Sequence, residues 1–229
     1  MTKSLAPTPH LRPMTVAEER LAARCIRGRV VLIDDDTEIL AALAALIELE
    51  GYACESYESA LAYLQVLNYN RPCFPGPCCV LCDVKMPELN GLELQRRLIE
   101  IDDTPLLLMS GASGAHEAAS AFRAGAQDFL IKPINADTLL AALVKALATS
   151  SERQQQHLRQ SELAARIAKL TERERDIARR VAAGQTNPVI AEQLGIALRT
   201  VKLHRQHAME KVGAGGTAEL VRIAGEGRL

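Results

Sequence analysis

The chain has 229 residues, of which 48% are hydrophobic and 3% aromatic, so one or two domains with largely aliphatic cores are expected. No apolar run approaches the roughly 18 residues that a membrane-spanning helix needs, and the first residues lack the sustained apolar stretch of a secretory signal. These features argue against a membrane protein and predict a cytoplasmic location.

The net charge of −1 conceals a division along the chain. Residues 1–149 hold 13 Lys and Arg against 19 Asp and Glu, a net charge of −6, whereas residues 150–229 hold 14 against 9, a net charge of +5. An acidic first part joined to a basic second part predicts two domains with different partners. The basic part is the candidate for binding the phosphate backbone of a nucleic acid.

After an N-terminal extension, residues 1–28, to which the sequence assigns no role, short apolar runs alternate with amphipathic stretches over residues 29–148. This alternation is typical of a parallel sheet with helical crossovers, so the fold class is α/β with a five-stranded doubly wound sheet. The expected strands are 29–33, 52–55, 78–82, 105–109 and 128–131. The expected helices are 37–50, 58–67, 91–101, 115–124 and 136–148.

The second part begins with a polar linker, residues 149–165, which contains neither Gly nor Pro and is expected to be at least partly helical. Residues 166–229 show no strand pattern, only short helical stretches bounded by glycines. The expected helices are 171–183, 188–194, 198–212 and 217–225. These four helices predict a small all-α domain.

Charged or hydroxyl-bearing residues come directly after four of the expected strands. Asp34 and Asp35 follow the first strand, Asp83 the third, Ser110 the fourth and Lys132 the fifth. Ligands of open α/β sheets bind at the carboxyl ends of the strands, so these side chains are expected to share one crevice. Clustered carboxylates suit a hard cation such as Mg²⁺. An aspartate can also act as a nucleophile that forms an acyl phosphate, which an ammonium and a hydroxyl would stabilise.

The same positions resemble the receiver domain of two-component response regulators, over about residues 29–148. The motifs that carry the resemblance are Ile33-Asp-Asp35, Cys82-Asp-Val-Lys-Met-Pro87, Met109-Ser-Gly111 and Ile131-Lys-Pro133. The resemblance implies a flavodoxin-like strand order, 2-1-3-4-5, with Asp83 as the phosphoacceptor. Ser110 and Lys132 would contact the phosphoryl group, and Phe129 would be the switch aromatic. The implied Mg²⁺ ligands are Asp34, Asp35, Asp83 and the backbone carbonyl of Lys85.

A receiver is not a classical enzyme, but by the resemblance it catalyses its own Mg²⁺-dependent phosphorylation and the later hydrolysis. In the family, the residues two positions after the phosphoacceptor and two after the hydroxyl can orient the attacking water. These are Lys85 and Ala112, and neither carries a carboxylate or an amide. Slow hydrolysis is therefore expected.

In the basic part, residues 198–212 follow a shorter helix that ends at Gly195. This is the layout of a helix-turn-helix, whose second helix enters the major groove of DNA. The side expected to pack inward is Val201, His204, Ala208 and Val212. The side expected to face bases is Arg199, Lys202, Leu203, Gln206 and Glu210. The flanking residues expected near phosphates are Thr200, Arg205 and His207.

Residues 165–227 resemble the LuxR-type DNA-binding domain. The matching residues are Leu170-Thr-Glu-Arg-Glu174, Asn187, Ile190-Ala191, Thr200-Val-Lys-Leu-His204 and Lys211-Val212. The whole chain therefore resembles the NarL/FixJ family of response regulators, and its FixJ branch more closely. This implies a sensor histidine kinase, a homodimer formed on phosphorylation through the receiver, a two-fold promoter DNA site and a dimer contact through the last helix. Pro188-Val189 stands where the family often has Lys-Glu, so phosphate binding would depend more on Arg199, Arg205 and Lys211.

Other interpretations are open at this point. The receiver could be non-switching, which would leave a constitutive or redox-modulated DNA-binding protein. Four cysteines, Cys73, Cys78, Cys79 and Cys82, could form a metal or redox site, although buried strand cysteines usually only pack. A phosphatase of the haloacid-dehalogenase type would need Asp-x-Asp at the nucleophile, whereas this chain has Asp83-Val-Lys85.

Overall fold

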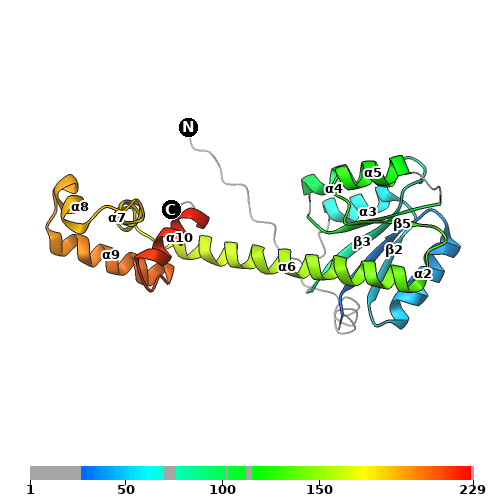
Figure 1. Cartoon of the computed structure of the whole chain (residues 1–229), viewed down its shortest axis with the longest axis horizontal. Helices are drawn as coiled ribbons and strands as arrows, with labels where there is room; N and C mark the ends of the chain where they lie inside the picture. Colours follow the sequence, from blue (N-terminus) through cyan, green and yellow to red (C-terminus); the bar gives the residue numbers. More distant parts are fainter. Residues whose placement is uncertain (1–26, 70–75, 102, 112–114, 228–229) are drawn as a thin grey trace. The chain divides into compact units, whose positions relative to one another are not determined.

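The computed structural model describes residues 27–69, 76–101, 103–111 and 115–227 (Figure 1). The chain divides into two compact units between Arg153 and Gln154. Apart from its last two residues, the N-terminal extension lies outside the described ranges. Within those ranges, every helix is too short or too polar to span a lipid bilayer.

The first unit is built on a five-stranded parallel sheet in the order β2-β1-β3-β4-β5, which confirms the predicted topology. The strands are β1 (Arg29–Ile33), β2 (Ala53–Tyr57), β3 (Cys78–Asp83), β4 (Leu106–Ser110) and β5 (Asp128–Ile131). The central strands β1, β3 and β4 are buried almost throughout because helices cover both faces of the sheet. In register, Ile33 lies opposite Cys82 and Asp83 lies opposite Met109, so these strands end together at one edge.

The two faces of the sheet carry separate hydrophobic cores. Helices α3 (Ala60–Tyr69), α4 (Gly91–Ile101) and α5 (Ala115–Arg123) cover one face, and α2 (Thr37–Leu49) and α6 (Ala136–Ala168) cover the other (Figure 1). Side chains alternate along each strand, as the pleat requires: Val31 and Ile33 enter the first core, and Val30 and Leu32 enter the second.

Helix α6 continues beyond the predicted helix 136–148 through residues 149–165, which confirms that this stretch is helical. Its first half packs on the sheet through Leu139 and Leu143, and the backbone N–H of Cys78 then donates to Ser150 Oγ at 3.0 Å. Arg153 extends this attachment with a hydrogen bond to the carbonyl oxygen of Asp103. Without Gly or Pro to stop it, the helix runs on to Ala168.

Two smaller differences occur near β2, whose polar sequence gives a weak strand signal. The strand pairs with β1 as far as Tyr57, two residues beyond the predicted end. Helix α3 therefore starts later than expected, after Ser59, whose Oγ accepts from the backbone N–H of Ala62 at 3.1 Å. A serine hydroxyl in this position is a usual helix start signal.

The second unit contains the end of α6 and four further helices: α7 (Glu172–Ala182), α8 (Asn187–Leu194), α9 (Leu198–Val212) and α10 (Thr217–Gly227). Their boundaries lie within two residues of the predicted ones. Gly195 and Gly213 end α8 and α9 with positive φ values of 63° and 76°, a conformation that favours glycine. One aliphatic core holds the unit together, with Ile177, Val201 and Leu220 fully buried.

Candidate functional site

Three of the predicted crevice residues meet at the carboxyl edge of the sheet. Lys132 Nζ lies 2.7 Å from Asp34 Oδ2 and 2.6 Å from Asp83 Oδ1. The parallel register brings the ends of β1 and β3 side by side, and the backbone N–H of Lys132 donates to the carbonyl of Ser110 at 2.8 Å. Both aspartates are buried, and the Lys132 side chain is 20% exposed. Solvent therefore reaches the crevice beside the ammonium.

The backbone fixes both carboxylates from the side opposite Lys132. Asp34 Oδ1 accepts from the backbone N–H of Asp36 at 3.0 Å, and Asp83 Oδ2 accepts from that of Lys85 at 2.6 Å. Each aspartate thus uses one oxygen to hold its orientation and turns the other toward the ammonium. Such charge-assisted hydrogen bonds are among the stronger ones in proteins.

The charges in the crevice do not balance, since two carboxylates face one ammonium. Burial acts to lower the pKa of Lys132, but its hydrogen bonds to Asp34 and Asp83 outweigh that effect and raise the pKa. The lysine therefore stays protonated at neutral pH, and the formal charge of the three side chains is −1. An excess negative charge in a largely buried site favours the binding of a further cation.

The remaining predicted residues of the receiver have different surroundings. Ser110 is fully buried at the end of β4, whereas Asp35 is exposed. Phe129 is half-buried and packs against the core beneath α3, α4 and α5. Asp36 caps α2, as a helix N-terminal aspartate should, by accepting from the N–H groups of Glu38 and Ile39.

The donor set fits a hard divalent cation in part. Over the described residues, no group of three or more His, Cys, Asp or Glu side chains is arranged to hold a metal ion. Asp34 and Asp83 nevertheless converge on one atom, Lys132 Nζ. Mg²⁺ commonly takes one or two carboxylates and completes its shell with water, phosphate oxygens or a carbonyl such as that of Lys85.

Gly91 is a position next to the candidate site whose close packing the sequence reasoning missed. It starts α4, and its N–H donates to the carbonyl of Val84 at 3.0 Å. A Cβ at this position would lie 2.4 Å from the carbonyl oxygen of Asp83 and 3.0 Å from Leu108 Cδ2. Only glycine allows the helix to pack this closely on the segment that carries the candidate phosphoacceptor. A glycine at a helix start was the available sequence signal.

The strand cysteines are placed as packing residues. Cys79 lies in the core beneath α2 and α6, and Cys82 lies in the core on the opposite face. Burial raises the pKa of both thiols well above the usual range, so they remain protonated. Cys73 lies outside the described residues. Opposite faces separate Cys79 from Cys82, which argues against one metal shared between them.

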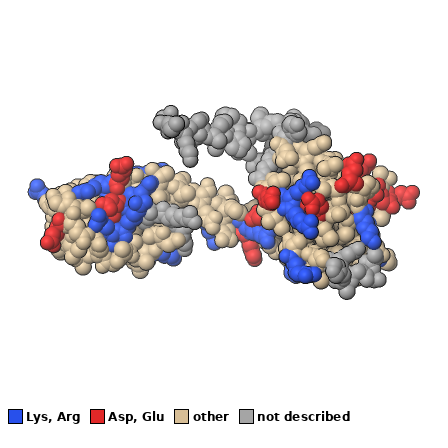
Figure 2. Space-filling view, turned by 90° about the horizontal axis from the view of Figure 1, so that it is seen from above, with Lys and Arg blue, Asp and Glu red and all other residues tan. Residues whose placement is uncertain are grey.

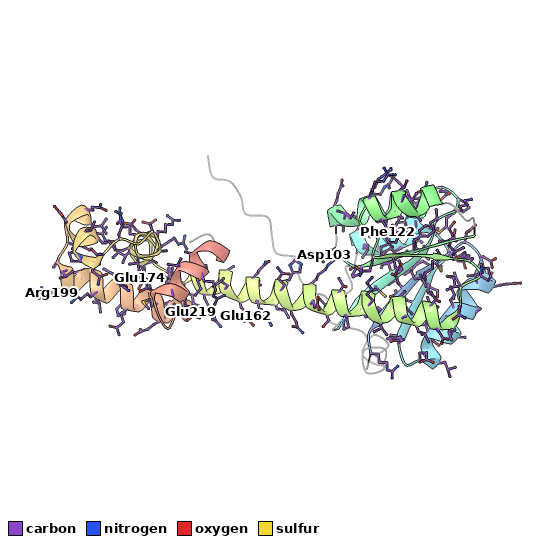
Figure 3. All side chains as sticks on the ribbon, viewed as in Figure 1. Asp103, Phe122, Glu162, Glu174, Arg199 and Glu219 are labelled. Carbon is purple, nitrogen blue, oxygen red and sulfur yellow. The ribbon has the colours of Figure 1, made fainter. Side chains whose placement is uncertain are left out.

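In the second unit, α9 presents the predicted polar side to solvent. Val201, Ala208 and Val212 are buried, as expected, and His204 is half-buried. The exposed side chains of the predicted base-facing side are Arg199, Lys202, Leu203, Gln206 and Glu210. Figure 3 shows Arg199 at the start of α9, and Figure 2 shows Lys and Arg side chains gathered on this unit with acidic ones between them. Leu203 is 50% exposed, so an apolar contact is available within a charged surface.

Lys211, which the sequence placed near a phosphate, forms an ion pair within the unit, and its side chain is 36% exposed. Its Nζ lies 2.9 Å and 2.6 Å from the two carboxylate oxygens of Glu174, a residue of α7 that is 3% exposed (Figure 3). Burial raises the pKa of Glu174, but hydrogen bonds from Lys211 and Thr171 outweigh it, so the pKa is lowered. Lys211 comes seven residues, or two helical turns, after His204, so both residues lie on the same side of α9. The ion pair with Glu174 shows that this side faces α7 at Lys211.

Two of the three flanking residues expected near phosphates, His207 and Arg205, also have partners. His207 Nδ1 lies 3.9 Å from Glu174 Oε1, with the ring 45% exposed. Arg205 Nη1 donates to Asn187 Oδ1 at 3.0 Å, and Arg205 Nη2 donates to Thr217 Oγ1 at 2.5 Å. Arg205 thereby joins α9 to the first residues of α8 and α10.

Comparisons with known proteins agree with this architecture. Residues 30–144 match the response regulator receiver domain family, and residues 168–224 match the luxR family of bacterial regulatory proteins. The transcriptional regulatory protein FixJ of Azorhizobium caulinodans is 37% identical over 85% of this chain and 90% of its own length. The response regulator protein TodT of Pseudomonas putida is 34% identical over 85% of this chain and 84% of its own length. The solved structure of the response regulator StyR has a TM-score of 0.75 at 32% identity, and the match covers 86% of this chain and 98% of the StyR chain.

The chain therefore belongs to the response regulators, in the group that joins a receiver domain to a LuxR-type helix-turn-helix. Its relatives include FixJ proteins, as the sequence motifs indicated, so it lies near the FixJ branch. It is a phosphorylation-dependent transcriptional regulator. The alternative of a constitutive or redox-modulated DNA-binding protein is not favoured.

Proposed function

We propose that Asp83 accepts a phosphoryl group from a sensor histidine kinase and that the second unit then binds promoter DNA as a homodimer. The observation that carries the proposal is the meeting of Asp34, Asp83 and Lys132 at one edge of the sheet. In this step, an oxygen of Asp83 attacks phosphorus while the bond from phosphorus to the kinase histidine breaks. The bonding electrons leave with the imidazole nitrogen.

The residues of the crevice have separate tasks in this reaction. Asp34, Asp83 and the carbonyl of Lys85 would hold Mg²⁺, with Asp35 close by in sequence, and the ion would neutralise phosphoryl oxygens. Lys132 now binds the free Asp83 carboxylate, and after transfer its ammonium can move to a phosphoryl oxygen. The hydroxyl of Ser110 would bind another oxygen. Phe129 lies in β5, the strand that ends directly before Lys132, and would respond to the movement of that lysine.

The chemical half of the proposal can be tested with acetyl phosphate, whose phosphoryl group would reach Asp83 in the same way with acetate leaving. We expect the intact mass to increase by one phosphoryl group when Mg²⁺ is present, and peptide mapping to place the label on Asp83. An unchanged mass, or a label on another side chain, would overturn the proposal. Because Lys85 carries no group that activates water, the acyl phosphate should persist for much longer than seconds.

Phosphorylation adds about −1.5 to −2 charges at Asp83, and we propose that this favours a dimer through the surface of α5 and β5. Two DNA-binding units would then match half-sites about one helical turn apart. Moving such an equilibrium from 1:99 to 99:1 takes about 5.5 kcal/mol, which phosphoryl contacts and dimerisation would supply together. Mapping of bound DNA across the genome should show sites in wild type that Asp83→Asn occupies weakly or not at all. Equal occupancy in both would refute phosphorylation-dependent binding.

A further inference from the structure

Helix α9 carries an arginine whose surroundings differ from those of its neighbouring lysine. Lys211 is neutralised by the buried carboxylate of Glu174. Arg205 instead donates to two neutral oxygens, Asn187 Oδ1 and Thr217 Oγ1. Across the described ranges of the chain, no carboxylate forms an ion pair with Arg205. Its guanidinium therefore keeps an uncompensated positive charge.

The two neutral partners restrain this charge without removing it. A guanidinium has five N–H donors in a rigid plane, and two of them are used by Asn187 and Thr217. The other three remain for a further acceptor. A free arginine side chain loses conformational entropy when it binds a ligand, and one that is already held loses less.

The held guanidinium lies at the surface predicted to meet DNA. A cleft of about 490 Å³ is lined by Arg205 together with Asn187, Lys202, Gln206 and Glu210. Lys202, Gln206 and Glu210 are exposed and belong to the base-facing side of α9, and the Glu210 carboxylate accepts from Gln206 Nε2 at 2.9 Å. Two cations against one carboxylate leave the cleft with a net positive charge, which suits a phosphate of the DNA backbone.

We propose that Asn187 and Thr217 are positioning residues that hold Arg205 ready to contact a DNA phosphate. The inference rests on the proposed DNA-binding function and adds to it that α8 and α10, which hold these residues, both set the affinity of α9 for DNA. Thr217 is the first residue of the C-terminal helix α10, so it links that helix to Arg205. A change at the start of α10 would reach the DNA contact through a single hydrogen bond.

The test uses the full-length protein, phosphorylated with acetyl phosphate and Mg²⁺, and a duplex that this form enriches from a random-sequence DNA pool. Binding is followed by fluorescence anisotropy at several salt concentrations. Arg205→Ala should reduce the slope of log affinity against log salt by about 1.8 for the dimer, because each of its two units loses one phosphate contact worth about 0.9 on B-DNA. Thr217→Val removes only the hydroxyl and should weaken binding about three- to tenfold, the range for one lost hydrogen bond, with the slope unchanged. Thr217→Ser keeps the hydroxyl and should restore binding.

A double variant establishes whether Thr217 acts through Arg205. Thr217→Val should cause no further loss of affinity in an Arg205→Ala background, because the group it positions is gone. A further loss there, or an unchanged salt slope in Arg205→Ala, would overturn the inference while the proposed function stood. A wild-type protein that enriches no duplex would overturn both. Thermal unfolding of each variant separates loss of contact from loss of fold, and Thr217→Ser provides the folded reference.

Discussion

The receiver and the DNA-binding unit each contain a lysine that binds buried carboxylate oxygens, but the charge balance differs. In the receiver, Asp34 and Asp83 share the ammonium of Lys132, so one negative charge is left over. In the DNA-binding unit, Lys211 meets Glu174 alone, and the pair is neutral. A balanced pair is complete and serves the fold, whereas an unbalanced site retains affinity for another ion. Charge balance thus distinguishes a lysine site that can attract a further cation from one whose charges already cancel.

The largest expected effect is loss of phosphorylation when the excess charge is removed. Asp83→Asn should accept no phosphoryl group from acetyl phosphate, since an amide oxygen is a poor nucleophile for this reaction. Asp36→Asn is the matched control, because Asp36 only caps α2 and asparagine caps equally well. Intact-mass measurement should show the label in Asp36→Asn and none in Asp83→Asn. Labelling of both variants would show that Asp83 is not the phosphoacceptor.

In the neutral pair of Lys211 and Glu174, removal of the lysine should cost more stability than removal of the carboxylate charge. Lys211→Met leaves the buried carboxylate of Glu174 without a counter-charge and should cost about 2 kcal/mol of unfolding free energy, below the range for a fully buried pair because the Lys211 side chain is 36% exposed. Glu174→Gln leaves a lysine that can turn to solvent and should cost only about 1 kcal/mol. Urea unfolding of both variants measures the difference. Equal losses would mean that Glu174 is better hydrated than its 3% exposure indicates.

Removal of the receiver lysine should cost a similar amount, because its side chain is 20% exposed against 36% for that of Lys211. Lys132→Met should lower the unfolding free energy by about 2 kcal/mol through repulsion between the two buried carboxylates. Adding Asp83→Asn to Lys132→Met should recover part of that loss, since a single carboxylate remains. Urea denaturation of the two variants and wild type is sufficient. A double variant less stable than Lys132→Met would contradict repulsion as the cause.

The smallest effect concerns pH. The pKa of Glu174 is lowered from its ordinary value of 4.5, so the stability from its ionised form is complete above 4.5. That stability is lost as the pH falls through the lower, folded-state pKa. Wild type and Glu174→Gln should therefore become more alike in urea unfolding as the pH is reduced from about 5 to about 3. A difference that stays constant over this range would show that the carboxylate charge contributes nothing.

The contribution of Lys132 to stability changes with pH in the opposite direction, because the pKa of this lysine is raised from the ordinary value of 10.5. Its contribution is complete below 10.5 and is lost as the pH rises through the folded-state pKa. The two lysine sites therefore lose stability at opposite ends of the pH scale. Acid should weaken the DNA-binding unit through Glu174, and alkali should weaken the receiver through Lys132.

The sequence predicted the alternation of strands and helices because apolar runs and the polar residues after them follow rules that apply along the chain, whereas the strand order came from the resemblance to receiver domains. It also indicated which side of α9 is exposed, since helical periodicity is local. It could not predict the partners of Lys211 and Arg205. Glu174 and Asn187 come from other helices, and only packing brings them to α9. The close approach at Gly91 was missed for the same reason, because the clashing atoms belong to β3 and β4.

The continuous helix α6 has a consequence for how such proteins can be recombined. From Gln154 to Glu162 every side chain of this helix is exposed, so intrinsic helix propensity has to maintain this stretch. Domain shuffling, in evolution or in the laboratory, would meet the fewest incompatible neighbours if chains were joined there.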